Sequence, residues 1–299
     1  MLALAALLAL CACDEGPTRS PPPEKQPAPA AVAFAPPAGF VKLRLGLTPF
    51  SSEETMRRTH EKLAAYLSRQ LSVPVEIAVG ASYDDTVGRL ANGEFDLVEL
   101  SPFAYVEASK RVKLRCLVQT IADGSATASG YIFVRDDSPR HTLADLKGAR
   151  FGFVDKRSTS GFLYPMKLLK EKGLDPEKDF ASVEFFGNHE AVLLAVLEGR
   201  IDAGATYQGS FAQARRNRGI DPLSFRVIGK TSRTPRDMYC VTLGVPVEVG
   251  DAITNALLPL TGRDRGGREI LGPLNVNGFQ KADDAAYDEV RQAAAAVGQ

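Results

Sequence analysis

Apolar residues recur along the chain in two periods, one typical of helices and the other of strands. Over residues 53–71, Met56, Leu63, Leu67 and Leu71 repeat at helical spacing, which predicts an amphipathic helix. Further helices are predicted at residues 189–198, 247–260 and 283–297. Short apolar runs predict strands at residues 42–47, 73–79, 95–100, 113–119, 130–135, 149–154, 182–187, 201–206, 225–229 and 238–243.

Predicted strands and helices alternate through the body of the chain. This order indicates an α/β fold with largely parallel sheets, whose ligand crevices lie at the carboxyl ends of the strands. Residues 41–299 are enough for one large lobe or two smaller ones. We find no internal repeat, zinc-ligand spacing, Walker phosphate loop or HExxH motif, so no cofactor or metal is expected.

The charge balance gives no sign of a nucleic-acid partner. Lys plus Arg equals Asp plus Glu at 36 each, and the chain contains no Trp. A nucleic-acid-binding protein usually carries a basic stripe and aromatic stacking platforms, and neither is visible in the sequence. We therefore expect a small-molecule ligand, with no nucleic acid and no anionic membrane face as a partner.

The first thirteen residues, MLALAALLALCAC, resemble a bacterial lipoprotein signal. The apolar run is shorter than the roughly 20 residues that a membrane-spanning helix needs. Leu10 stands three residues before Cys13 and Ala12 directly before it, which fits Cys13 as the acylated residue. The alternative is an ordinary secretory signal. The lipoprotein interpretation predicts a periplasmic or cell-surface protein that is held to the membrane by a lipid anchor only.

Residues 14–40 are predicted to be a tether. Eight prolines fall between residues 14 and 38, together with Ala, Glu, Lys and Gln. Such a composition cannot bury a core and favours an extended chain.

Two cysteines, Cys116 and Cys240, remain after the signal. Each lies in an apolar run that predicts a strand, LRCLV and MYCVTLG. An oxidising compartment allows a disulfide between them, while two buried thiols are an equal alternative.

Residues 151–163, FGFVDKRSTSGFL, carry the strongest chemical signal. A short apolar strand is followed by Ser158, Thr159, Ser160 and Gly161, where a helix is predicted to begin. A helix start leaves backbone N–H groups without intrahelical partners, so this segment can form an anion cradle. The alternative is a plain helix N-cap. Pro165 requires the helix to start no earlier than about Gly161, or to bend.

Four blocks of sequence together resemble the phosphonate-binding periplasmic proteins, the substrate receptors of phosphonate, phosphate and phosphite ABC importers. The blocks are ASYDDTVGRLANGEFDLVELSPFAYV at 81–106, LADLKGARFGFV at 143–154, STSGFLYP at 158–165 and NHEAVLLAVLEGRIDAGAT at 188–206. The resemblance implies a type 2 periplasmic-binding protein fold, with two α/β lobes joined by crossover strands. The crossovers are expected near residues 122–130 and 233–240. Lobe 1 would comprise residues 41–125 and 240–299, and lobe 2 residues 126–239.

The resemblance also implies ligand positions in lobe 2. Ser158, Thr159 and Ser160 match the hydroxyl run that holds the phosphonate oxygens. His189 matches the family's histidine at the next helix start, where either charge state can donate to an oxyanion. From the residue alone, a His at this place is more often a cap or a surface residue.

Further ligand positions are implied in lobe 1 and at the crossovers. Tyr83 aligns with a site tyrosine, with plain packing as its alternative. Leu100 and Ser101 end a strand where the family places ligand-facing side chains, although Leu100 departs from a polar residue. Tyr105 lines the crevice or belongs to the core. Asp237 matches an acidic position and could accept a proton from the ligand, with a solvated turn beside Arg236 as the alternative.

The segment after residue 206 bears on the ligand's charge. Aminoalkylphosphonate receptors of this family place an acid there, whereas this chain reads Tyr207-Gln208-Gly209-Ser210. A buried ammonium without a counter-charge is costly to desolvate, so a cationic tail is not expected. Tyr207 remains a ligand candidate, and Asp202 in the preceding strand is expected to be structural.

These observations leave three functional classes. The first is a monomeric binding receptor that passes a small tetrahedral oxyanion to an ABC transporter permease without chemistry. The second is a ligand-sensing partner of a membrane histidine kinase. The third is a hydrolase with Ser158 or Ser160 as nucleophile and His189 as base, which the sequence favours least because it shows no nucleophile elbow.

Overall fold

The computed structural model describes residues 34–298. The expected signal, Cys13 and most of the expected tether lie outside the described residues. Within residues 34–298, no helix combines the length and the apolar character needed to cross a membrane.

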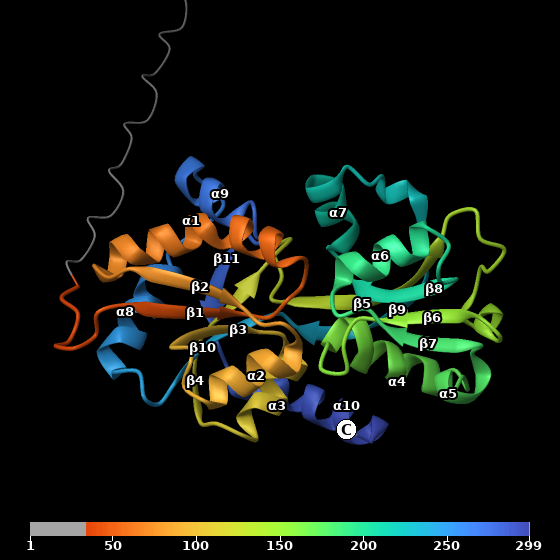
Figure 1. Cartoon of the computed structure of the whole chain (residues 1–299), viewed down its shortest axis with the longest axis horizontal. Helices are drawn as coiled ribbons and strands as arrows, with labels where there is room; N and C mark the ends of the chain where they lie inside the picture. Colours follow the sequence, from red (N-terminus) through yellow and green to blue (C-terminus); the bar gives the residue numbers. More distant parts are fainter. Residues whose placement is uncertain (1–33, 299) are drawn as a thin grey trace, which may run out of the picture. The chain divides into compact units, whose positions relative to one another are not determined.

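The first of two sheets has six strands in the order β11-β4-β10-β3-β1-β2 (Figure 1). The strands are β1 (Leu43–Leu47), β2 (Val75–Val79), β3 (Leu97–Leu100), β4 (Leu114–Ile121), β10 (Met238–Thr242) and β11 (Gly278–Lys281). Leu43, Leu45 and Leu47 of strand β1, which lies between β3 and the edge strand β2, are fully buried. Each such side chain contributes about 1.5–3 kcal/mol of hydrophobic stabilisation, so β1 anchors this sheet.

The second sheet has five strands in the order β7-β6-β8-β5-β9. The strands are β5 (Thr127–Arg135), β6 (Arg150–Phe153), β7 (Ser182–Phe185), β8 (Ala203–Tyr207) and β9 (Phe225–Pro235). The chain leaves the first sheet at the end of β4 and enters the second at β5, through residues 122–126. It returns from β9 to β10 through Arg236 and Asp237 alone, and both passages fall within the ranges that the resemblance implied.

The expectation of largely parallel sheets is wrong. The parallel pairs are β1–β2, β1–β3, β6–β7 and β6–β8. The antiparallel pairs are β10–β3, β10–β4, β11–β4, β5–β8 and β5–β9. The strands next to the two passages between the sheets run against their neighbours. Apolar runs do not encode strand direction, so the sequence pattern could not show this.

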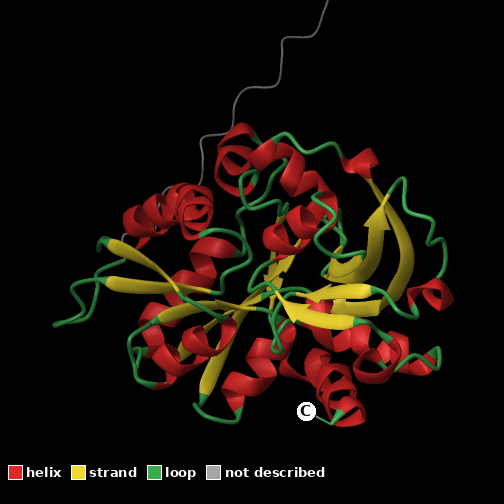
Figure 2. Cartoon of the chain, turned by 45° about the vertical axis from the view of Figure 1, so that its right-hand side comes forward, coloured by secondary structure: helices red, strands yellow, loops and turns green. Residues whose placement is uncertain are grey.

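Helices cover both faces of each sheet (Figure 2). Against the first sheet lie α1 (Glu53–Leu71), α2 (Tyr83–Ala91), α3 (Pro102–Ser109) and α8 (Val247–Leu257), while α9 (Arg265–Leu271) packs on α1. Against the second lie α4 (Tyr164–Glu171), α5 (Pro176–Asp179), α6 (His189–Leu197) and α7 (Ser210–Arg218). The last helix, α10 (Asp288–Val297), contacts both α3 and α4, so it packs against elements of both sheets.

Cys116 and Cys240 lie opposite each other in the β4–β10 pair, and both are free thiols. Cys240 is fully buried and Cys116 is partly buried. The structure therefore corresponds to the buried-thiol alternative.

Candidate functional site

A cavity of about 110 Å³ lies between elements of the two sheets. Its lining includes Tyr83, Ser101, Ser158, Thr159, Ser160, His189, Tyr207 and Asp237. The structure thus brings eight of the ten sequence-predicted ligand residues to one cavity. The other two, Leu100 and Tyr105, lie outside it.

The cradle segment begins where β6 ends and the chain turns into a helix. Ser158 is the N-cap, and its Oγ accepts a 3.1 Å hydrogen bond from the Gly161 N–H. The first turn, Thr159–Leu163, is a π-helix, and α4 follows with Pro165 in its first turn. The cap and the cradle are therefore compatible, because the Ser158 hydroxyl hydrogen remains for a second partner.

Gly130 of β5 allows this segment to approach the second sheet. A Cβ atom at residue 130 would lie 2.9 Å from the carbonyl oxygen of Ser160 and 3.3 Å from its Cα. Both are backbone atoms, which cannot rotate away. Any side chain at residue 130 would therefore displace the cradle from the cavity.

Thr159 connects the cradle to the other side of the cavity. Its Oγ1 accepts a 2.8 Å hydrogen bond from the backbone N–H of Phe103, near the start of α3. Ser101 is the N-cap of α3, and its Oγ accepts from the Ala104 N–H at 3.4 Å. The Thr159 hydroxyl can still donate its own hydrogen, so one side chain can hold α3 and a ligand at once.

His189 is the first residue of α6, after the N-cap Asn188. Burial lowers the pKa of the imidazole to about 3, so the ring is neutral at ordinary pH. Its Nδ1 lies 3.0 Å from the hydroxyl of Thr206. A ring that accepts from Thr206 at Nδ1 carries its proton on Nε2 and can donate it to an oxyanion. The Tyr207 ring packs edge-on against the imidazole, with 4.8 Å between the two ring centroids.

Two buried hydroxyls in the cavity lining, Tyr83 Oη and Ser129 Oγ, lack a hydrogen-bond partner within residues 34–298. Leaving a polar group buried and unpaired costs about 1–3 kcal/mol, so each is a natural ligand contact. Burial raises the pKa of Tyr83 well above its ordinary value, which keeps its phenol protonated and able to donate.

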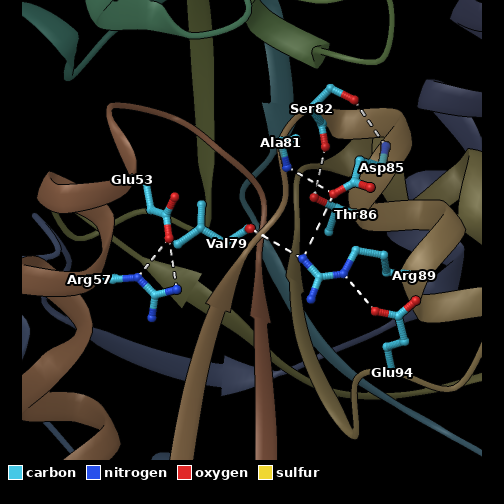
Figure 3. Close-up of polar contacts among 9 residues, drawn as sticks. All are labelled: Glu53, Arg57, Val79, Ala81, Ser82, Asp85, Thr86, Arg89 and Glu94. Atoms are coloured by element: carbon cyan, nitrogen blue, oxygen red, sulfur yellow. Dashed lines mark hydrogen bonds and ion pairs between the residues drawn. The ribbon is translucent and has the colours of Figure 1, made fainter.

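Tyr83 is the first residue of α2. Figure 3 shows the polar contacts of the neighbouring residues at the start of this helix. Ser82 Oγ accepts from the Asp85 N–H at 3.0 Å, while the Asp85 carboxylate accepts from the Ala81 N–H at 2.9 Å. Arg89 donates to the carbonyl of Val79, which ties the helix to the end of β2. These bonds fix the start of α2, to which Tyr83 belongs, and none of them involves the tyrosine side chain.

Asp237 lies in the return passage just before β10. Burial, and then the charge of Glu99, raises the pKa of its carboxyl to about 7. The neighbouring Arg236 donates to the carbonyl of Ser125 at 2.9 Å, so its guanidinium holds the first passage between the sheets. The carboxylate of Asp237 receives no side-chain or backbone hydrogen bond within residues 34–298.

The ionisable residues of the cavity lining that sequence reasoning missed include the buried pair His60 and Glu99, besides Arg236. His60 and Glu99 are 4% and 6% exposed, and His60 Nε2 lies 2.9 Å from Glu99 Oε2. The available signal was the acid itself, because Glu99 interrupts the otherwise apolar strand LVEL.

Leu100 and Tyr105 belong to the hydrophobic core. Successive side chains of a strand point to opposite faces, so Leu100 faces away from the side on which Glu99 and Ser101 line the cavity. The Tyr105 hydroxyl donates to the carboxylate of Asp284, and its ring packs edge-on against Tyr287 at 5.2 Å. Asp202, expected to be structural, pairs with Arg150 at 2.9 Å.

Two further hydrogen bonds beside the cavity join a loop of the first sheet to a helix of the second. Ser51 Oγ donates to Glu190 Oε2 at 2.6 Å, and the His189 N–H donates to the carbonyl of Phe50 at 3.2 Å. Glu190 is buried and also pairs with Arg218 at 2.6 Å. Residues that follow β1 are thus bonded directly to the start of α6.

Comparisons with known proteins agree with this arrangement. The phosphate-import protein PhnD of Mycolicibacterium smegmatis is 27% identical over 222 residues, covering 71% of this chain and 69% of that protein. A binding-protein component of an ABC phosphonate transporter from Pseudomonas aeruginosa superposes with a TM-score of 0.81 at 21% identity, covering 86% of each chain. PhnD1 of Prochlorococcus marinus, solved in complex with methylphosphonate, superposes with a TM-score of 0.79 at 21% identity. That superposition covers 86% of this chain and 98% of PhnD1.

These structural neighbours share the two-lobe periplasmic binding-protein fold with this chain. The family described as the periplasmic substrate-binding proteins of phosphonate ABC transporters matches residues 45–287. This match spans most of the chain and includes the whole donor-lined cavity. The chain therefore belongs to the family of periplasmic substrate-binding proteins of phosphonate ABC transporters.

Proposed function

We propose that the chain captures one small tetrahedral oxyanion of the phosphonate, phosphite or phosphate type in this cavity and delivers it to an ABC transporter permease. The observation that carries the proposal is the set of donors in one small cavity. Tyr83 and Ser129 present unpartnered buried hydroxyls, and Ser158 and Thr159 keep their hydroxyl hydrogens. His189 adds a neutral imidazole N–H.

The number of donors is sufficient for tight binding. A hydrogen bond to a charged group contributes roughly 1.5–3 kcal/mol, and micromolar affinity corresponds to about 8 kcal/mol. Five such bonds contribute roughly 7.5–15 kcal/mol, which covers this value and part of the cost of immobilising the ligand. No net positive charge is needed at the site.

The cavity volume is compatible with a small ligand. A cavity of about 110 Å³ has room for a tetrahedral anion with a short substituent. The methylphosphonate bound by PhnD1 of Prochlorococcus marinus is a ligand of this size class and supports the proposal.

The state of His189 favours capture without chemistry. An effective general base has a pKa near the working pH, whereas burial lowers that of His189 to about 3. The Ser158 oxygen already accepts a hydrogen bond from Gly161, and its position is set by that cap. We therefore propose a receptor and no hydrolase.

The lipid anchor belongs to the same proposal. An acylated Cys13 and a tether over residues 14–40 would hold a monomeric receptor at the membrane, within reach of its permease. Each buried methylene of an acyl chain contributes about 0.8 kcal/mol, so several chains give stable anchoring. Changing Cys13 to Ser should release the protein from the membrane fraction.

Calorimetric titration of the full chain with phosphate, phosphite and methylphosphonate tests the binding function. We expect at least one dissociation constant in the micromolar range or below. The matched variant Tyr83→Phe removes one hydroxyl and keeps the ring, so it should weaken binding by about 1–3 kcal/mol. Absence of binding by all three anions to the folded protein would refute the proposal.

A further inference from the structure

The cavity contains a buried His60–Glu99 pair that the oxyanion cradle does not need. His60 comes from α1 and Glu99 from β3, and both line the cavity. A buried ion pair adds little net stability, because desolvation of the two groups offsets their attraction. Its presence in the cavity therefore points to a role in recognition.

The hydrogen-bond partners of His60 fix how the pair is protonated. Nδ1 lies 2.8 Å from the carbonyl oxygen of Met56, which can only accept, so Nδ1 carries a proton. The contact between Nε2 and Glu99 Oε2 then holds one further proton between imidazole and carboxyl. The Glu99 carboxyl also forms a side-chain hydrogen bond with Tyr239, its partner residue on β10, and it lines the cavity as an acceptor.

The carboxyl of Glu99 gives this side of the cavity an acceptor character, and Asp237 lies beside it with a carboxyl that keeps its proton up to about pH 7. The β3–β10 register explains their proximity, because Glu99 pairs with Tyr239 and Leu100 with Met238, directly after Asp237. The other side presents the hydroxyls of Ser158 and Thr159 and the N–H of His189. A ligand that satisfies both sides needs oxyanion oxygens at one end and a hydrogen-bond donor at the other.

We propose that the His60–Glu99 pair is a specificity-determining element, which selects oxyanions that carry a hydrogen-bond donor. His60 is the positioning residue and Glu99 the contact. The donor is either a P–OH group that the anion retains or a short ammonium substituent. This inference rests on the proposed function and names the ligand chemistry of the same site.

The physical basis is the cost of unpaired acceptors. A site built to accept a hydrogen bond rejects an analogue that lacks the hydrogen, by as much as about 10⁴–10⁵-fold, because the buried acceptors remain unsatisfied. Methanesulfonate has the shape of methylphosphonate and, in mildly acidic buffer, the same charge, but it retains no hydrogen on its oxygens. The structure therefore predicts strong discrimination between these two anions.

The test measures the affinity ratio of methylphosphonate to methanesulfonate by calorimetry on the full chain, in mildly acidic buffer. The wild-type chain should prefer methylphosphonate at least 100-fold. Glu99→Gln should lower this ratio about tenfold or more, because a neutral amide replaces a charged acceptor. Asp96→Asn is the matched control, since Asp96 pairs with Arg44 at 2.6 Å outside the cavity, and it should keep the wild-type ratio.

His60→Gln provides a second variant should Glu99→Gln fail to fold. It retains Glu99 but loses the ring that orients it, and the affinity ratio should again fall. If His60 and Glu99 served stability alone, both variants would have a lower unfolding temperature and the wild-type affinity ratio. Aminomethylphosphonate separates the two donor sources: tighter binding than methylphosphonate identifies an ammonium, and equal or weaker binding identifies P–OH.

Two outcomes would overturn the inference. One is a wild-type chain that binds both anions equally, and the other is a folded Glu99→Gln variant with the full wild-type ratio. Either result leaves the proposed receptor function intact as long as methylphosphonate binds. Failure of the wild-type chain to bind phosphate, phosphite and methylphosphonate would instead refute the receptor function itself.

Discussion

The two walls of the cavity are built in opposite ways. The donor wall, defined as Ser158, Thr159, Ser160 and His189, lies at two helix starts, where the local backbone fixes each side chain. The acceptor wall, defined as Glu99 and Asp237, comes from residues far apart in sequence that the β3–β10 pairing brings together.

The walls also differ in their effect on the empty protein. The hydroxyls of the donor wall take part in caps and interlobe bonds that support the fold. In the acceptor wall, burial and then the nearby charge of Glu99 raise the pKa of Asp237. The donor wall therefore combines stability with binding, whereas the acceptor wall reduces stability in the absence of a ligand.

The largest expected effect comes from the one side chain that joins the donor wall to α3. Thr159→Val keeps the shape but removes both the acceptor for the Phe103 N–H and the donor to the ligand. We expect binding of phosphate or methylphosphonate to weaken by about 2–4 kcal/mol in calorimetry. Thr159→Ser, which keeps the hydroxyl, is the control, and equal losses in both variants would contradict this role.

The acceptor wall predicts a pH-dependent stability. The pKa of Asp237 is about 7 in the folded chain, against 3.8 ordinarily. Between these values the folded state holds a proton that the unfolded state has released, so the free energy of unfolding falls as the pH rises from about 4 to about 7.

We therefore expect Asp237→Asn to raise the free energy of unfolding by about 2 kcal/mol near pH 8 and by much less near pH 4. Urea denaturation of the ligand-free protein at both pH values measures the difference. If Asp237→Asn lowered the free energy of unfolding equally at both pH values, the carboxyl of Asp237 would not destabilise the folded protein.

His189 should act as a neutral donor. Because its pKa is about 3, the imidazole does not change charge between about pH 5 and 8. His189→Gln keeps an N–H donor and should weaken binding by about 1 kcal/mol, by the same factor across this range. If the difference from the wild-type chain grew below about pH 6.5, a charged imidazole would be responsible.

The smallest effect concerns the interlobe bond from Ser51 to Glu190, which lies beside the cavity. Ser51→Ala removes this bond while Glu190 keeps its partner Arg218. We expect affinity for phosphate to fall about fivefold, equivalent to about 1 kcal/mol, because a bond that joins the two lobes beside the cavity is lost.

The neighbouring serine supplies the control for that measurement. Ser52 caps α1, and its Oγ accepts from the Thr55 N–H. Ser52→Ala should lower the unfolding temperature without changing affinity. An equal loss of affinity in both variants would mean that the Ser51 bond has no specific part in ligand binding.

Local signals explain what the sequence could predict. Helix α1 was predicted at residues 53–71 and has these bounds, because Ser52 caps it and its apolar stripe is regular. Ser158, Thr159, Ser160 and His189 were predicted as ligand positions from contiguous blocks, and all four line the cavity. Their role as ligand contacts stays a prediction.

Features that depend on strand pairing could not be predicted in the same way. Strand β11 was missed because its four residues, GFQK, include one large apolar side chain and it forms by pairing with β4. Strand β9 was predicted at residues 225–229 but extends to Pro235, where it pairs with β5. Glu99 was missed because its place beside Asp237 follows from the β3–β10 register and not from any local pattern.

A crystal structure of the full chain with methylphosphonate tests the central claim most directly. The two walls predict phosphonate oxygens within hydrogen-bond distance of the Ser158 and Thr159 hydroxyls and of His189 Nε2. They also predict one ligand oxygen against the carboxylate of Glu99 or Asp237. A ligand that binds outside this cavity, or one whose oxygens do not contact the Ser158–Ser160 segment, would contradict the account.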